Sequence, residues 1–392
     1  MRLSLLIALA LTSLAAPACA EPGGSTPADE PLEDIPERPE PIMAGIAASM
    51  TRLLPLALAD DGFADPANGA AITEALAGLE THADALTRYA WGEDAGFVWL
   101  ARSLAEDVKV TGEAHAAGRH GAASFYAQRL TAHCVACHSR QPATGSSDLG
   151  QTLFAAVEPA AASLDEIAFL QQATRQWEDA ARTYEELLVE PPRSLASGPM
   201  WWFTDYLVLR IRVLEQPARA KPLLDRHASN PELPALVRED LAAWSAAIDT
   251  LGPVPSAAAD QLARARALVS EGRASGRSGT GRSALVQWIR ASALLLKYIA
   301  GREDGGDDLA EAYWLLGLCE AEIGHAAQLS VPEYYLEAAV RAAPGSAFAK
   351  EAFAMLEWRV AVQYTGSGGA YIPADVEAVL ERLRELIRTA GN

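Results

Sequence analysis

The sequence predicts an all-α protein in which a four-helix bundle at residues 42–145 precedes a helical array at residues 160–392. Apolar residues recur with the period of an amphipathic helix along four successive segments before residue 142. Short stretches with glycine and proline separate these segments, and four helices joined by short turns favour an up-down-up-down bundle. After residue 146 the helical period continues to the end of the chain, and short helices recur in pairs.

The length is sufficient for two domains, or for one domain and a repeat array, and the composition is sufficient for a substantial core. The chain has 392 residues, of which 50% are apolar and 21% are charged. Its formal net charge of −19 argues against nucleic acid and against anionic membrane surfaces as partners. A partner with a basic or a neutral docking face fits this charge better.

Residues 1–20 have the features of an export signal. Arg2 gives a positive start, residues 3–14 form an apolar run, and Ala18-Cys19-Ala20 is a small-residue cleavage site. A lipid on Cys19 is the alternative, and it would tie the mature chain to a membrane. No later segment reaches roughly 18 uninterrupted apolar residues, so we expect a periplasmic protein with no transmembrane span in its mature chain.

The bundle helices follow a proline-rich tether. Residues 21–41 hold six prolines among acids and glycines, a composition that prevents regular structure. The first helix is expected over residues 41–59. The others are expected after the turns at Asp65-Pro66 and Trp91-Gly92, and from His120 to before Pro142.

A Cys-Val-Ala-Cys-His motif lies near the end of the fourth predicted helix. Two thiols at this spacing, followed directly by histidine, are the attachment site of a c-type haem. On a helix, Cys134, Cys137 and His138 share one face. The motif therefore predicts one covalent haem c, with thioethers from Cys134 and Cys137 and with His138 as the proximal iron ligand.

The alternative for this motif is half of a zinc site. That site would need a second ligand pair at similar spacing, and the sequence offers none. If Cys19 leaves with the signal, Cys319 is the one cysteine outside the motif. Its helical, apolar context predicts a small buried residue.

The segment resembles the class II cytochromes c, the group of cytochrome c-prime and its low-spin relatives, over about residues 41–142. In that family the haem motif lies near the end of the fourth helix, as Cys134, Cys137 and His138 do here. The family often continues with an aromatic and a basic residue, where this chain has Ser139-Arg140-Gln141-Pro142. Arg140 is a candidate contact for a haem propionate.

The sixth iron position has two methionine candidates in the first helix. In low-spin members of the family a thioether from the first helix is the distal ligand. Met43 and Met50 share a face, about 10 Å apart along the axis, so only one of them binds. Met43 is the favoured ligand because it lies nearer the end that meets the haem motif. Met50 or an open site is the alternative.

Three other residues are weaker ligand candidates. His82 on the second helix is expected to be an ordinary hydrogen-bonded histidine. His133 points about 100° away from Cys134 around the helix. Met200 precedes Trp201-Trp202-Phe203 and is expected to be a packing residue.

Parts of the second half resemble tetratricopeptide repeats. Residues 176–188 and 334–344 are similar to the second helix of that repeat, and residues 310–324 to its first. Small residues at Gly317, Ala338 and Ala339 permit close helix crossing. Residues 276–283 nearly match a nucleotide phosphate loop, but they follow a helical run and not a strand, so no nucleotide is expected.

These features predict a non-enzymatic cytochrome that transfers single electrons to or from a redox partner protein or a membrane complex, with the array as docking region. Methionine ligation raises the reduction potential of a haem and leaves no vacant site. Two alternatives stay open. One is a high-spin haem protein that binds a small gas such as NO or CO, and the other is an assembly scaffold with a structural haem.

Overall fold

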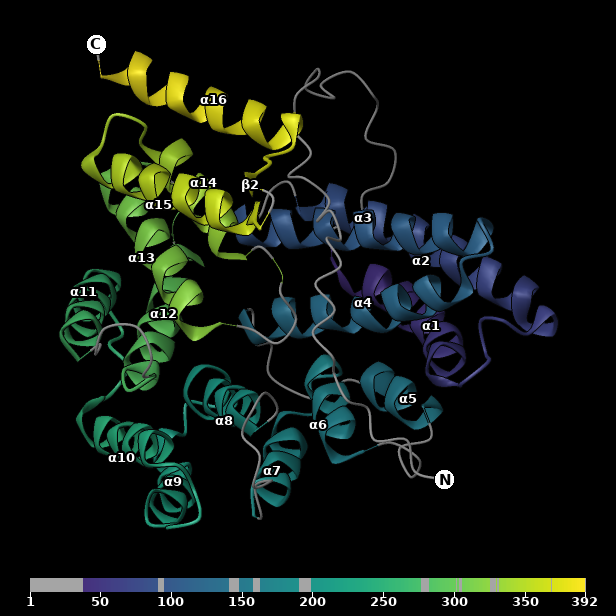
Figure 1. Cartoon of the computed structure of the whole chain (residues 1–392), viewed down its shortest axis with the longest axis horizontal. Helices are drawn as coiled ribbons and strands as arrows, with labels where there is room; N and C mark the ends of the chain where they lie inside the picture. Colours follow the sequence, from purple (N-terminus) through teal and green to yellow (C-terminus); the bar gives the residue numbers. More distant parts are fainter. Residues whose placement is uncertain are drawn as a thin grey trace.

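The computed structural model describes residues 38–90, 95–140, 148–157, 163–189, 199–275, 282–300, 302, 305–324, 329, 331–367 and 369–391. Within these ranges the regular structure is helical apart from one short hairpin, β1 (Thr365–Gly366) and β2 (Gly369–Ala370) (Figure 1). The predicted all-α class is thus confirmed. The predicted signal, and the tether as far as residue 37, lie outside the described residues.

The first four helices close on one another. They are α1 (Glu40–Leu58), α2 (Gly69–Ala90), α3 (Ala95–Ala116) and α4 (His120–Arg140), and a short 3-10 turn η1 (Pro66–Asn68) precedes α2. Each helix packs against the next, and α1 also packs against α4. Their apolar stripes meet in one core that includes Met50, Leu53, Ile72, Leu79, Leu86, Val108 and Leu130.

Helix α1 is long and apolar enough to cross a membrane by length and composition alone. In the structure Ile42, Ile46 and Leu53 are buried in the bundle core, whereas Leu58 at the end of the helix is exposed. A core helix of a bundle passes the same test, so this feature is weak evidence for a membrane span.

Two short helices extend the bundle core past residue 145. Helix α5 (Asp148–Ala156) packs on α1, and α6 (Leu164–Ala173) packs on α4. Leu153 of α5 and Leu170 of α6 are buried in the same core as Leu130. These helices therefore cover the end of the bundle where the haem motif lies.

The remaining helices build a second core. They are α7 (Trp177–Leu187), α8 (Pro199–Val208), the π-helix η3 (Leu209–Val213), η4 (Pro217–Arg219), α9 (Lys221–Ala228), α10 (Ala235–Thr250), α11 (Ala258–Ser275), α12 (Leu285–Ala300), α13 (Asp307–Ile323), α14 (Val331–Ala342), α15 (Ala347–Gln363) and α16 (Ala374–Ala390). Neighbours in sequence pair along much of this array, as α13 and α14 do (Figure 1). The close packing of α13 on α14 depends on Gly317, because a Cβ added at this position would lie 3.0 Å from the Leu336 side chain.

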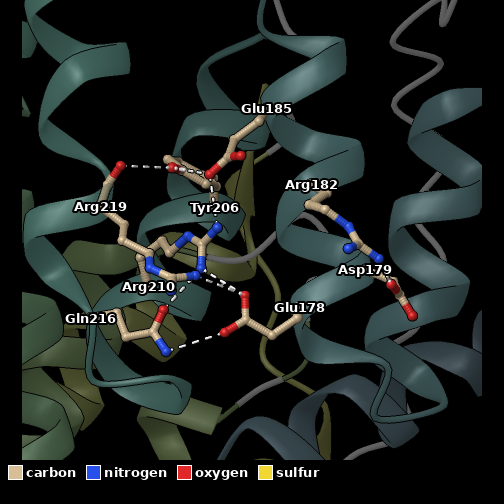
Figure 2. A network of polar contacts seen from close by, with 8 residues as sticks. All are labelled: Glu178, Asp179, Arg182, Glu185, Tyr206, Arg210, Gln216 and Arg219. Atoms are coloured by element: carbon tan, nitrogen blue, oxygen red, sulfur yellow. Dashed lines mark hydrogen bonds and ion pairs between the residues drawn. The ribbon is translucent and has the colours of Figure 1, made fainter.

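Arg210 holds the π-helix to α7. Its guanidinium forms ion pairs with Glu178 at 3.0 Å and with Glu185 at 2.8 Å (Figure 2). Tyr206 donates a hydrogen bond to Glu185 at 2.7 Å, and Gln216 donates one to Glu178 at 3.1 Å. These charge-assisted hydrogen bonds to two carboxylates offset the free-energy cost of burying the positive charge of Arg210.

Candidate functional site

The haem motif occupies the last two turns of α4. Cys134 and Cys137 are half-buried, and the Cys134 thiol lies 3.8 Å from the Leu130 carbonyl oxygen one turn earlier. Burial raises the pKa of the Cys134 thiol to about 11, because an apolar surrounding disfavours the thiolate. Both sulfurs are on one side of the helix, at the spacing that the motif requires.

His138 is fixed by a backbone carbonyl from outside the four-helix bundle. Its Nδ1 lies 2.9 Å from the carbonyl oxygen of Ala173, the last residue of α6. A carbonyl oxygen only accepts, so Nδ1 carries the hydrogen and Nε2 holds the lone pair. Burial, with a contribution from the Arg175 charge, lowers the pKa of His138 to about 3, so the ring is neutral. A neutral imidazole oriented by a backbone acceptor is the usual state of a metal-ligating histidine.

An apolar pocket opens beside Cys137. Its enclosed space is about 30 Å³, close to the volume that one water molecule occupies. Helices α3, α4, α12, α13 and α14 supply its lining, which consists of Gly96, Phe97, Leu100, Cys137, Arg140, Leu296, Ile299, Ala300, Leu316 and Tyr335. The pocket thus lies between the bundle and the second core.

Arg140 joins the haem motif to the array. Its guanidinium forms an ion pair with Glu320 of α13, and it also donates to the Ala136 carbonyl oxygen at 2.8 Å. The second oxygen of Glu320 accepts from Arg212 of η3 at 2.7 Å. The Glu320 side chain is fully buried, and the two arginine side chains are nearly so. Three segments distant in sequence therefore meet at this carboxylate.

Arg175 is a second cation beside the motif, two residues after the end of α6. Its backbone has a φ of 60°, in the left-handed region that costs free energy for a residue with a Cβ. Its Nε is buried without a hydrogen-bond partner among the described residues. The charge of Arg175 acts on both Cys137 and His138. An anionic group bound at the motif would therefore give the Arg175 side chain a partner.

The residue types at the motif are those that hold a covalent haem, and the lining of the pocket would have to move apart to admit a porphyrin, because its enclosed space is about 30 Å³. The two thiols have the spacing of the vinyl groups, His138 presents a neutral ring, and the pocket at Cys137 is apolar. The unpartnered nitrogen of Arg175 fits a haem propionate.

Hydrogen bonds between α1 and α4 set the register of the methionines. Ser124 and Gln128 donate to the Ala57 carbonyl oxygen at 2.8 and 2.7 Å. The two helices run antiparallel, so stepping back along α1 corresponds to stepping forward along α4. Ala57 lies opposite residues 124–128 of α4. Counting back from Ala57, Met43 is therefore level with the turn of α4 that contains His138, and Met50 is level with the preceding turn. Met50 is 2% exposed in the bundle core, whereas Met43 is partly buried against it.

The weaker candidates have other partners. His133 is buried, and its Nε2 lies 2.7 Å from a carboxylate oxygen of Asp107 on α3. The His82 ring lies against the backbone of Gly45 on α1. Met200 packs against the second core, and Cys319 is fully buried, as expected. Of the segment that resembles a phosphate loop, residues 276–281 are outside the described ranges, and helices α11 and α12 stand on its two sides.

Comparison with protein-family models, with curated proteins and with solved structures finds no match for this chain.

Four residues around the motif are not predicted from the sequence: Ala173, Arg175, Arg212 and Glu320. Ala173 contributes only a backbone oxygen, which has no sequence signal. Glu320 follows Cys319 in an apolar helical stretch, but Glu322 lies two residues later and is exposed, so the sequence does not indicate which of the two acids is buried. Its two partners cannot be inferred from the sequence, because they come from distant segments.

Proposed function

We propose that this chain is an exported monohaem c-type cytochrome that transfers single electrons. Cys134 and Cys137 bind the haem as thioethers, and His138 is the proximal ligand. The observation that carries this proposal is the neutral His138 ring, held through Nδ1 by the Ala173 carbonyl oxygen at 2.9 Å. The likeness of the motif and its bundle to class II cytochromes c supports the same assignment.

The side chains around the motif determine what such a haem does. When bound, the haem supplies an iron that alternates between the ferrous and ferric states. The bond to Ala173 keeps the His138 ring in one orientation, which limits reorganisation between the two oxidation states. A thioether from Met43 would fill the sixth position and raise the potential. The apolar lining excludes water from the side of Cys137.

The array is proposed to dock the cytochrome onto a redox partner protein or a membrane complex in the periplasm. Its helix pairs support this role, because arrays of the tetratricopeptide type present extended binding surfaces. Trp99 of α3 stacks on Tyr334 of α14 with ring centroids 5.5 Å apart, which fixes α14 against the bundle. Because this chain has a formal net charge of −19, its partner is expected to present a basic face.

The test is production with the export signal in a bacterial host that attaches haem c. The expected result is that the peptide with Cys134 and Cys137 gains the mass of one haem, and that a Cys134→Ser, Cys137→Ser variant does not. A bare peptide mass in both chains would refute the proposal.

An optical spectrum of the loaded protein then separates the two haem functions. A six-coordinate low-spin spectrum with a methionine-iron band supports electron transfer. A high-spin spectrum that changes on addition of carbon monoxide would instead assign the chain as a gas-binding protein.

A further inference from the structure

Helix α15 has apolar residues on two opposite faces. One face is buried where α15 packs on α13, α14 and α16 (Figure 1), and it consists of Ala349, Ala352, Phe353, Leu356 and Val360. Trp358 lies two residues from both Leu356 and Val360, so it points about 200° away from each around the helix. A helix with apolar residues all round is normally buried all round. The outward face of α15 is therefore expected to have a partner.

The outward face is a continuous apolar stripe. It consists of Ala354, Met355, Trp358, Ala361 and Val362, at the spacing of residues that share one helix face. Trp358 is 62% exposed and Val362 is 56% exposed. Ala354 is also exposed, and Met355 and Ala361 are partly buried. These five residues are called the outward stripe below.

Exposed apolar side chains are concentrated at this end of the array. Among the described residues, the three most exposed large apolar side chains are Tyr371, Trp358 and Val362. Tyr371 is 80% exposed and follows the hairpin after α15, and its backbone amide donates to the Tyr364 carbonyl oxygen at 2.9 Å. Single exposed apolar residues are normal on a protein surface, whereas patches with tryptophan and tyrosine are typical of protein–protein interfaces.

The outward stripe is electrically neutral in a strongly acidic chain. The charged residues on each side of Trp358 are paired within the chain, Glu357 with Arg384 at 2.5 Å and Arg359 with Glu333 at 2.6 Å. Helix α15 as a whole has two acidic and two basic residues, whereas the chain has a formal net charge of −19. This face therefore offers little attraction to a basic partner, and two acidic chains can meet here without local repulsion.

The outward stripe is also complementary to itself. Ala354 and Val362 lie four positions on either side of Trp358, and Met355 and Ala361 lie three positions on either side. If two copies of α15 pack antiparallel about a two-fold axis at Trp358, Ala354 of one copy meets Val362 of the other, and Met355 meets Ala361. Each of these contacts places a small side chain against a larger one, which permits close packing. Self-complementarity of this kind is what a symmetric dimer requires.

We propose that the outward stripe of α15 is the interface of a homodimer, in which two copies of α15 pack antiparallel with Trp358 at the centre. Tyr371 extends the interface past the end of the helix. This dimer does not depend on the proposed function, because the interface contains no residue of the haem motif. One helix face from each copy is a small contact area, so the dissociation constant is expected in the micromolar range.

Sedimentation equilibrium of the mature chain between about 1 and 200 μM tests the dimer. A monomer–dimer equilibrium is expected in the haem-loaded protein and also in the Cys134→Ser, Cys137→Ser chain. Added salt is expected to strengthen dimerisation, because it screens the repulsion between two acidic chains and leaves the apolar contact intact. A monomer at every concentration would overturn the proposal.

Trp358→Glu places a charge from each copy at the centre of the interface. It is expected to raise the dissociation constant at least about 30-fold, as the loss of a central aromatic residue does. Because Trp358 is exposed in the monomer, the thermal midpoint of the dilute protein is expected to change little. An unchanged dissociation constant would show that the interface lies elsewhere and would overturn the proposal.

Phe125→Glu is the matched control. Phe125 is an exposed aromatic residue of α4, and its neighbours on the same helix face, Gly121, Gln128 and Arg129, form no apolar stripe. The substitution introduces the same charge outside the proposed interface, so the dissociation constant is expected to stay unchanged. Equal effects of Trp358→Glu and Phe125→Glu would assign the loss of dimer to net charge alone and overturn the proposal.

Cross-linking tests the arrangement without a disruptive charge. Among the described residues of the double-serine chain, Cys319 is the one native thiol, and it is fully buried. Ala354→Cys and Val362→Cys chains in this background are mixed with oxidised glutathione, which oxidises two facing thiols to a disulfide. A disulfide between the two variants is expected in the mixture. Each variant alone is expected to cross-link far more slowly, because like positions lie about 12 Å apart along the helix axis. Equal rates alone and in the mixture would overturn the proposal.

Discussion

The Nδ1 atom of His138 lies 2.9 Å from the backbone carbonyl oxygen of Ala173, 35 residues further along the chain. This contact joins the end of α4 to the end of α6, so the ring orientation depends on a helix outside the four-helix bundle. Arg140, two residues after His138, is tied in the same way to Glu320 of α13. The haem motif is therefore oriented by segments that follow the bundle in sequence.

Replacement of Glu320 by glutamine is expected to destabilise the haem-free double-serine chain by about 3–5 kcal/mol. The reason is that Arg140 and Arg212 would remain buried with no carboxylate between them. Urea unfolding at neutral pH measures the difference.

Glu322→Gln is the matched control, because Glu322 is exposed on the same helix. Its effect is expected to stay within about 0.5 kcal/mol. Equal effects of the two substitutions would contradict the buried ion-pair cluster.

The sequence was sufficient for the local features of this protein. The helices of the bundle follow from their apolar period, and α1 begins one residue before the expected Pro41. The proximity of Cys134, Cys137 and His138 also follows from helical geometry alone, because the three residues belong to two adjacent turns.

The remaining site contacts depend on tertiary structure. Glu320 meets Arg140 across 180 residues of sequence, and no periodicity encodes which buried acid meets which arginine. The attachment of α5 and α6 to the bundle core is a similar case, because Leu153 and Leu170 are ordinary apolar residues of short helices. The π-helix η3 brings Arg210 and Arg212 to different partners, and no feature of the amino-acid composition predicts a π-helix there.

Asp205 is expected to make stability fall as the pH rises. Burial raises the pKa of this carboxyl to about 7, and the Tyr184 hydroxyl lies 3.3 Å from it. An unfolded aspartate has a pKa near 3.9, so the folded chain keeps a proton that the unfolded chain releases between these values. The contribution is complete below about pH 4 and is lost as the pH rises through about 7.

Asp205→Asn should therefore be more stable than the unsubstituted chain by about 1–3 kcal/mol above pH 7, and equal to it near pH 4. Urea midpoints at both ends of this range measure it. Asp84→Asn, at an exposed position of α2, is the control and should show no such trend. A constant difference across the range would show that Asp205 does not titrate on unfolding.

Gly45 is expected to be required where α1 meets α2. A Cβ at this position would overlap the His82 ring, so Gly45→Ala should destabilise the chain by about 1–3 kcal/mol. Adding His82→Ala should restore most of the loss, because it removes the overlapping ring. Gly112→Ala on α3 faces open space and should instead stabilise by up to about 1 kcal/mol. Equal urea midpoints for the alanine variants at 45 and 112 would contradict this packing.

Met43 is expected to be the distal ligand of the loaded protein, because the hydrogen bonds from Ser124 and Gln128 to Ala57 set α1 level with the His138 turn at residue 43. Met43→Leu should abolish the methionine-iron band and allow carbon monoxide to bind the ferrous protein. Met50→Leu should keep the band, since that side chain is buried among Leu53, Ile72 and their neighbours in the bundle core. Leucine has a volume close to that of methionine, so both variants are expected to fold. Loss of the band in Met50→Leu alone would assign the ligand to the neighbouring turn, and a band that survives in both would exclude a thioether from α1.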